Sequence, residues 1–282
     1  MKVAGREVTP LYGPHFGLAS HPFAETVDPS AFVPLPSRIA TLNRLRHGLD
    51  TGPGAVAAFG PPGLGKTLLA RKLAEALGGP VVPLSYPMMP AVELMAVLAR
   101  ELDRDATVAR LWGAIDPLAV SIHRIRASLT SATLSGTRRL VILDEAHLID
   151  DPATFEALRL LLNFTTRGVP DLGLILVGGP ELMAKLPESL ADRLGASCPV
   201  LPLTASESSA YVLGRLALAG ARSPLFGPPA VAALHHESGG SPRRLNRLAD
   251  LALLIAFARG QAAPDAEAVS LAAREAAFER AA

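Results

Sequence analysis

The sequence predicts an α/β fold, with a parallel sheet flanked by helices, followed by a small all-helical domain. Short apolar runs alternate with helical patterns as far as residue 178; the runs are Ala55–Phe59, Val81–Leu84, Leu140–Leu143 and Gly173–Gly178. Near-continuous apolar strands separated by helices indicate a parallel sheet that is covered on both faces. After residue 200 only helical patterns remain. Because 282 residues exceed the usual size of one domain, we expect two, at residues 1–200 and 201–282.

Composition and charge limit the classes of protein to which this chain could belong. Apolar residues make up 49% of the chain and charged residues 19%, which is typical of a globular protein. The net charge of +1 favours neither nucleic acid nor membrane, so a DNA-binding surface would have to be a local patch. The single cysteine, Cys198, allows no internal disulfide, and we expect it to be a small buried residue. Residues 1–10 lack the apolar core of a secretion signal, and no apolar run approaches ~20 residues. We therefore expect a cytoplasmic protein without a membrane span.

The first 50 residues divide into an irregular segment and a helix. Residues 1–36 are rich in proline, glycine and aromatic residues, which indicates a segment pinned by ring packing. Residues 38–50 follow a helical spacing, with Ile39, Leu42, Leu45 and Leu49 on one face and Arg38, Arg44, Arg46 and His47 on the others. We interpret these basic residues as a solvated face; a phosphate or DNA contact is the alternative.

A glycine loop follows the first predicted strand. Its residues match the pattern G-x-x-x-x-G-K-T and lead into a helical pattern at Leu68–Leu77, which is the context this motif requires. The glycines let several backbone N–H groups point at one phosphate chain, and the helix N-terminus adds partial positive charge. Lys66 is predicted to reach the β- and γ-phosphates of ATP, and the Thr67 hydroxyl to bind Mg²⁺. The predicted nucleotide-binding residues are Gly60, Pro61, Pro62, Gly63, Leu64, Gly65, Lys66, Thr67 and Leu68.

The strand at Leu140–Leu143 runs directly into two carboxylates, Asp144 and Glu145. The carboxyl end of a strand is where ligands bind in open parallel sheets. In a chain that also has the glycine loop, we expect Asp144 to join Thr67 in the Mg²⁺ shell. Glu145 is predicted to polarise the water that attacks the γ-phosphate.

Helical patterns account for most of the remaining chain. Before residue 200 they cover residues 90–102, 118–134 and 153–163, and Asp150 or Asp151 is expected to cap the last of these ahead of Pro152. After residue 200 they cover 206–219, 228–237, 242–259 and 264–280. Thr204 and Glu207 match a capping box at the start of the first. These patterns predict a small domain of about four helices.

Phosphoryl transfer also needs cations that stabilise the developing charge, and two arginines are candidates. Arg243 opens a predicted helix of the second domain and could reach over the γ-phosphate; a surface arginine on a basic helix, with Arg244 and Arg247, is the alternative. Arg193 follows the last predicted central strand by about one helix and could act across a subunit boundary as an arginine finger. Its alternative is a solvated or ion-paired arginine.

One more pattern is spread along nearly the whole chain. Its parts are His15-Phe-Gly-Leu18, His21-Pro-Phe23, Val27-Asp-Pro29 and Phe32; Leu143-Asp-Glu-Ala-His147, Leu158-Arg-Leu-Leu161 and Asn163; Leu176-Val-Gly-Gly-Pro-Glu-Leu182; and Arg215-Leu216, Ala219-Gly220, Phe226 and Ser238-Gly-Gly-Ser-Pro-Arg243-Arg-Leu-Asn246. Together they resemble AAA+ ATPases, and within them the general secretion pathway A (ExeA-type) group. Shorter relatives of similar architecture, of the TniB type, serve DNA transposition. Gly179 stands where the ExeA-type group has a glutamine, near the place of a γ-phosphate sensor.

Three functions follow from the residues and the resemblance. The first is an ATP-hydrolysing AAA+ protein that forms a ring or filament and assembles or switches a partner protein complex of a secretion, pilus or envelope machine. The second is a DNA-associated ATPase of the transposition type, with Arg38, Arg44, Arg46, Arg138 and Arg139 as candidate contacts to double-stranded DNA. The third is a nucleotide-gated scaffold that hydrolyses slowly or not at all, and Gly179 is its only support.

Overall fold

The computed structural model describes residues 10–102 and 118–281 of the chain. Residues 1–9, on which the expected lack of a secretion signal largely rests, lie outside the described part. The chain folds into two compact units. The sheet unit comprises Ala40–Pro62 and Lys66–Val200, and the helical unit comprises Leu201–Ala282 with residues up to Ile39 and with Gly63–Gly65. The sequence-based boundary at residue 200 remains a proposal.

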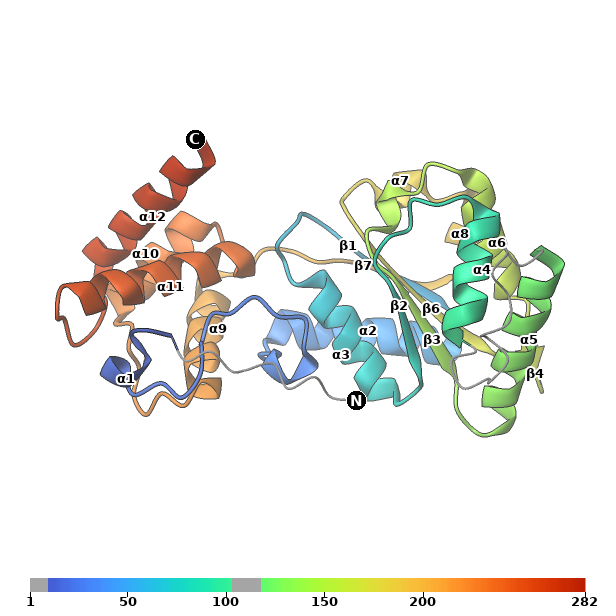
Figure 1. Ribbon diagram of the computed structural model, residues 1–282, viewed down its shortest axis with the longest axis horizontal. Helices are drawn as coiled ribbons and strands as arrows, with labels where there is room; N and C mark the ends of the chain where they lie inside the picture. The colour runs from blue at the N-terminus through green and yellow to red at the C-terminus, as the bar shows by residue number, and fades with distance from the viewer. Residues whose placement is uncertain (1–9, 103–117, 282) are drawn as a thin grey trace. The chain divides into compact units, whose positions relative to one another are not determined.

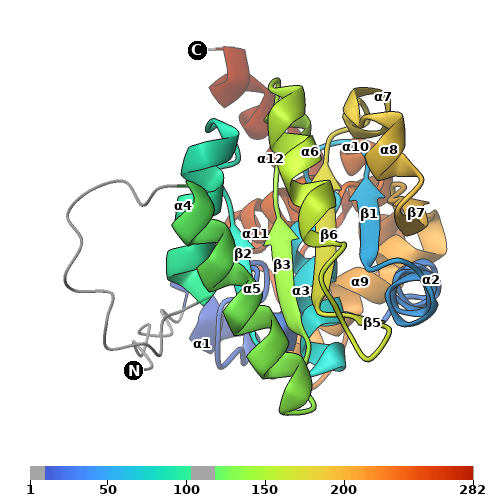
Figure 2. The same cartoon turned by 90° about the vertical axis from the view of Figure 1, so that its right-hand side faces the viewer.

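The sheet unit is built on a five-stranded parallel sheet with the order β2-β3-β6-β1-β7 (Figures 1 and 2). The strands are β1 (Ala55–Phe59), β2 (Val81–Leu84), β3 (Arg139–Leu143), β6 (Leu172–Gly178) and β7 (Leu194–Pro199). Every residue of β6 is buried, as expected for a central strand covered on both faces. The predicted α/β class and parallel sheet are confirmed.

Helices cover both faces of this sheet, with α3 on one face and α4, α5 and α6 on the other in Figure 1. The helices of this unit are α2 (Pro36–Thr51), whose first turn belongs to the helical unit, α3 (Lys66–Leu77), α4 (Ala91–Leu102), α5 (Leu118–Leu134), α6 (Pro152–Leu161), α7 (Leu182–Lys185) and α8 (Glu188–Ala191). A 3-10 turn spans Ala146–Leu148, and a small hairpin pairs β4 (Thr165–Thr166) with β5 (Val169–Pro170). Asp151 caps α6 by accepting a hydrogen bond from the Ala153 N–H at 3.0 Å, as the sequence predicted.

The helical unit contains α9 (Ala205–Leu218), α10 (Pro228–Ser238), α11 (Pro242–Ala258) and α12 (Ala266–Ala281). The capping box at Thr204 and Glu207 is present. The N-terminal segment belongs to this unit and has only a short helix, α1 (Gly13–Phe16), and a 3-10 turn at Pro29–Ala31 in its described residues. Its rings pack into the core of the unit, where Tyr12, Phe16 and Phe23 are buried, so the predicted pinning by aromatic packing is confirmed.

Two sequence-based expectations about the first long helix are wrong. Arg38 was expected on a solvated face, but it is 7% exposed and its guanidinium donates to Leu201 O at 2.9 Å. Ile39, expected to point inward, is 38% exposed. The helix begins inside the helical unit, so its first turn packs against a different core from the rest, and a single helical face cannot describe both.

The strand β7 was missed because its sequence, Leu-Gly-Ala-Ser-Cys-Pro, has no β-branched or aromatic residue. It pairs with β1 at one edge of the sheet, and Cys198 lies within it at 1% exposure, which confirms the predicted burial of this cysteine. Burial raises the pKa of the Cys198 thiol, and the nearby charge of Arg44 opposes this only in part.

Candidate nucleotide site

The glycine loop begins at the carboxyl end of β1, and three of its glycines have positive φ angles. The φ angles of Gly60, Gly63 and Gly65 are 147°, 78° and 81°. A Cβ at position 60 would lie 2.5 Å from the carbonyl oxygen of Val200, so only glycine fits there. The Gly60 N–H donates to the carbonyl of Gly178 at 3.2 Å, which ties the start of the loop to the end of β6.

Lys66 and Thr67 are the first residues of α3, directly after the loop. The Lys66 ammonium donates to two carbonyl oxygens of the loop, Gly60 O at 2.8 Å and Pro61 O at 2.9 Å. The cation is therefore folded over the loop whose N–H groups are predicted to bind phosphate. Thr67 Oγ1 donates to Asp144 Oδ2 at 2.7 Å.

Asp144 and Glu145 follow the carboxyl end of β3, and the order of the parallel strands places this end near the glycine loop. β3 pairs with β6 and β6 pairs with β1, all parallel, so all three strands end at the same edge. Asp144 Oδ1 accepts the Glu145 N–H at 3.0 Å. Glu145 itself has a φ of 52°, a left-handed conformation that is uncommon outside glycine and recurs at functional sites.

His147 completes this edge, although its sequence context did not mark it as a site residue. Its Nδ1 accepts the Gly179 N–H at 3.0 Å and lies 3.5 Å from Glu145 Oε2. Its Nε2 lies 3.2 Å from Glu181 Oε1. The position of this histidine two residues after Glu145, in the run Asp-Glu-Ala-His, was the signal available from sequence. Its partners could not be found that way because Gly179 and Glu181 follow a different strand.

Arg243 opens α11 and contacts the middle of the glycine loop through its backbone, within the helical unit. Its N–H donates to Gly63 O at 3.1 Å, and Ser241 Oγ donates to the same oxygen at 3.4 Å. The guanidinium points elsewhere, because its Nε lies 3.5 Å from Glu25 Oε1 and the side chain is 61% exposed. The sensor role of this side chain remains a prediction.

The structure does not bring Arg193 together with Lys66. Arg193 precedes β7, and the next residue, Leu194, pairs with Ala55, the first residue of β1. The glycine loop follows the last residue of β1, and a strand rises about 3.3 Å per residue, so Arg193 lies at the opposite end of the strand. Its Nη2 donates to Asn163 Oδ1 at 3.0 Å.

The donor set fits a magnesium nucleotide. A threonine hydroxyl and a carboxylate that already touch at 2.7 Å are hard oxygen ligands of the kind Mg²⁺ prefers. Beside them lie one ammonium group and a glycine loop at a helix N-terminus, which suit phosphate oxygens. A Cβ built on Gly65 meets nothing within 4 Å, so this part of the loop is open.

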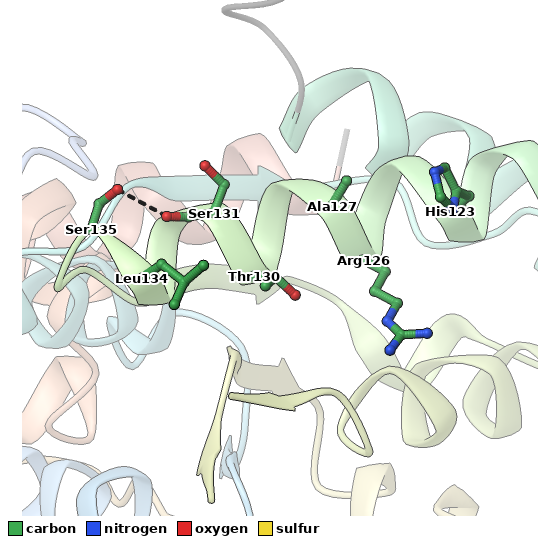
Figure 3. A pocket seen from close by; sticks show the side chains of 7 residues that line it. All are labelled: His123, Arg126, Ala127, Thr130, Ser131, Leu134 and Ser135. Carbon is green, nitrogen blue, oxygen red and sulfur yellow. Dashed lines mark hydrogen bonds between the residues drawn. The ribbon is translucent and has the colours of Figure 1, made fainter. Parts of the chain in front are cut away.

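A separate pocket of about 540 Å³ lies along α5 (Figure 3). Its lining residues are His123, Arg126, Ala127, Thr130, Ser131, Leu134 and Ser135. The Arg126 guanidinium lies 5.8 Å from the centre of the Phe164 ring. The residues predicted to bind nucleotide do not line this pocket, so it is distinct from the candidate site.

The site has a glycine loop between a buried strand and a helix, and the Thr67 hydroxyl beside this loop donates to Asp144 at the end of β3. This arrangement defines a P-loop nucleotide-binding fold. Residues 49–186 match the family model of the AAA domain, which confirms the predicted resemblance to AAA+ ATPases. The resemblance to the ExeA-type group is also confirmed. General secretion pathway protein A of Aeromonas hydrophila is 35% identical over 262 residues, which cover 89% of this chain and 46% of that protein.

Solved structures agree with this fold. Cdc6p from Pyrobaculum aerophilum matches with a TM-score of 0.68 and 18% identity, over 86% of this chain and 67% of that chain. The Aeropyrum pernix Orc1 protein in complex with DNA matches with a TM-score of 0.60 and 21% identity, over 87% and 66%. The chain spans about half the length of the curated relatives that it matches. In the described part of the chain, no helix has the length and apolar character needed to cross a bilayer.

Proposed function

We propose that the protein is a cytoplasmic, Mg²⁺-dependent ATPase that assembles with copies of itself and uses the ATP cycle to assemble or switch a partner protein complex. The observation that carries this proposal is the 2.7 Å contact between Thr67 Oγ1 and Asp144 Oδ2. It joins the glycine loop and the acidic strand end into one metal-binding edge, with Lys66 and Glu145 beside it. Similarity to General secretion pathway protein A supports a protein complex as the partner.

Each side chain has a defined part in this proposal. Bound MgATP supplies a phosphoanhydride bond and a cation that neutralises the phosphate charge. Lys66 turns from the carbonyls of Gly60 and Pro61 to bind phosphate oxygens, while Thr67 and Asp144 hold the metal. Glu145 accepts a proton from the attacking water, a role for which its exposed carboxylate is suited. Arg193 acts on the site of a neighbouring copy, because it lies at the far end of β1 from its own loop.

A DNA-associated ATPase is the second candidate, and the fold shared with an Orc1 protein solved in complex with DNA favours it. The residues offered as DNA contacts give it less support than the sequence did. The guanidinium groups of Arg38 and Arg138 both donate to backbone carbonyls; Arg138 donates to Leu49 O and Leu172 O at 2.8 and 2.7 Å. Arg44 and Arg46 are exposed and remain candidates.

The test measures the ATPase rate and particle size together, with and without double-stranded DNA, for the parent protein and Glu145→Gln. Loss of a general base costs about 10²–10⁴ in rate, so the variant should bind ATP without turning it over and should stabilise any oligomer. Turnover that ignores DNA supports the leading proposal. Turnover that requires DNA and weakens steeply with salt supports the second candidate. A parent protein that binds ATP without hydrolysis would contradict both and leave a nucleotide-gated scaffold.

A further inference from the structure

We infer that His147 is a positioning residue for Glu145, and that it acts by joining Glu145 to the Glu181 carboxylate, which fills the space beside Gly179. This inference rests on the proposed ATPase function and names two further residues that hydrolysis depends on. The four residues come from two chain segments: the turn after β3 carries Glu145 and His147, and the loop after β6 carries Gly179 and Glu181.

The Glu181 carboxylate occupies the volume that a side chain at position 179 would need. A Cβ built on Gly179 would lie 2.5 Å from Glu181 Oε1 and 2.7 Å from Oε2. Real Cβ atoms essentially never come within 3.0 Å of such atoms, so a side chain at position 179 would displace the carboxylate from this place. Since β6 ends beside β1 and β3, the carboxylate is placed at the same sheet edge as the glycine loop and the acidic pair.

Both nitrogens of the His147 ring are engaged, and their partners determine the tautomer. Nδ1 accepts the Gly179 N–H at 3.0 Å, so it carries a lone pair. The ring hydrogen of the neutral imidazole is then on Nε2, which faces Glu181 Oε1 at 3.2 Å. The side chain is 16% exposed, so the ring is held between the two chain segments with little room to turn.

This ring is coupled to Glu145 through a short turn. The Leu148 N–H donates to Glu145 O at 2.8 Å, closing the 3-10 turn that contains His147. Glu145 at the start of the turn has a left-handed φ of 52°. The coupling runs through this backbone turn, because Nδ1, which lies 3.5 Å from Glu145 Oε2, carries a lone pair and has no hydrogen to donate to the carboxylate. A residue in this region is strained and keeps the conformation only where its surroundings hold it. The anchoring of His147 to the β6 loop is a contact that can hold it.

A general base works only within hydrogen-bond reach of its proton, and a shift of about 1 Å can cost 10²-fold in rate. We therefore expect His147→Ala and Glu181→Ala each to lower kcat by roughly 10- to 100-fold. The Kd for ATP should stay within about twofold, because the hydrogen bond and ion pairs of these two side chains are made outside the glycine loop. The double variant should be no slower than the slower single variant, since residues that act as a unit are not additive.

Gly179→Ala gives an independent test, because it adds a methyl group and removes no functional group. It should displace the carboxylate of Glu181, a flexible side-chain end, with little change in the thermal unfolding temperature, and should lower kcat as Glu181→Ala does. Hydrogen exchange at the Gly179 amide should accelerate in His147→Ala with no nucleotide present. His236→Ala and Glu188→Ala, both at exposed positions, are the matched controls and should match the parent protein.

The outcomes separate this inference from the function it rests on. A parent protein without turnover would remove the proposed function and the positioning role together. A parent protein that hydrolyses ATP, with His147→Ala and Gly179→Ala turning over normally, would overturn the inference alone. A fall in kcat that is matched by a fall in unfolding temperature in all three single variants would identify the cluster as structural, and would overturn it as well.

Discussion

Lys66 is held ready for a ligand by its own loop. Its ammonium donates to two backbone carbonyls of the loop, at 2.8 and 2.9 Å, so bound phosphate has to compete with these acceptors. An ammonium group already makes charge-assisted hydrogen bonds to carbonyls, and a phosphate oxygen adds attraction between opposite charges. We therefore expect a phosphate group to displace the carbonyls of Gly60 and Pro61 from Lys66.

Replacing this lysine should weaken nucleotide binding while leaving the fold intact. A hydrogen bond to a charged group contributes about 1.5–3 kcal/mol, so Lys66→Ala should weaken ATP binding by at least roughly 10-fold, and by more if two phosphate oxygens are bound. Titration calorimetry with ATP measures this directly. Lys72→Ala, in the same helix α3, is the control, since Lys72 pairs with the exposed Glu75. Equal affinities for the two variants would contradict the role of Lys66.

At the scale of single elements, the N-terminal segment and α9 form one structure. The buried Arg215 of α9 donates through Nε to Pro22 O and through Nη2 to Ala24 O, both at 2.8 Å, and through Nη1 to the Tyr211 hydroxyl at 3.2 Å. One side chain thus satisfies backbone groups of a segment that has almost no regular secondary structure of its own among its described residues.

Removing this arginine should release the segment. Arg215→Met keeps most of the side-chain volume but leaves buried acceptors unpaired, which costs about 2–4 kcal/mol of the free energy of unfolding. Limited proteolysis should then cut within residues 10–35 before any other site. Arg222→Met, at an exposed position just after the same helix, should behave like the parent protein. Unchanged proteolysis in Arg215→Met would show that ring packing alone holds the segment.

Glu207 gives the start of α9 a dependence on pH. Burial raises the pKa of this carboxyl, but the Ser37 and Thr204 N–H groups that it accepts and the charge of Arg38 outweigh burial, so its pKa lies below the ordinary value. An acid with a lowered pKa stabilises the fold above its unfolded pKa of about 4.3, and this stability is lost as the pH falls through the lower, folded value.

Glu207→Gln should therefore lose stability at pH 7, by about 1 kcal/mol for a capping residue, and should differ less from the parent protein at about pH 3. Urea unfolding at the two pH values measures the difference. Glu267→Gln is the matched control, since Glu267 lies in the first turn of α12 and is exposed. A constant gap between Glu207→Gln and the parent protein across this range would mean that the carboxylate charge is not what stabilises the cap.

The sequence allowed most elements to be predicted, and the failures have physical causes. Leucine and isoleucine runs identified β3 and β6 because buried parallel strands have no polar face. β7 at the sheet edge lacks such a run, so its sequence does not stand out from the helix and linker patterns around it. Arg138 was offered as a DNA contact, but it crosses to carbonyls at Leu49 and Leu172, contacts that depend on strand order. Strand order is set by tertiary packing, which local patterns do not contain.

The residues of the candidate site also divide into those that local motifs indicate and those that depend on tertiary packing. Lys66, Thr67, Asp144 and Glu145 could be proposed from the sequence because each lies in a local motif with a known spacing. His147 and Glu181 were not found, because the contact between them joins two strands that are separated in the sequence and adjacent only in the sheet.

At the scale of the whole molecule, the position of Arg193 requires a second copy if this arginine takes part in hydrolysis. Arg193→Ala should bind ATP normally and lose turnover, by about 10³–10⁵ for a full arginine finger. Mixing it with Lys66→Ala should restore part of the activity, because one copy then supplies the nucleotide loop and the other supplies the arginine. Arg100→Ala, on the exposed side of α4, is the control and should need no such complementation. Normal turnover of Arg193→Ala alone would contradict the role of this arginine in trans.

The burial of Cys198 has a practical consequence. The only thiol of the chain is enclosed in β7 and its pKa is raised, so it is a poor nucleophile toward maleimide reagents while the protein is folded. Cysteines introduced on exposed positions of the two units can then carry spin labels or fluorophores selectively, in the natural sequence background. Distances between such labels, measured with and without ATP, would test whether the nucleotide changes the separation of the two units.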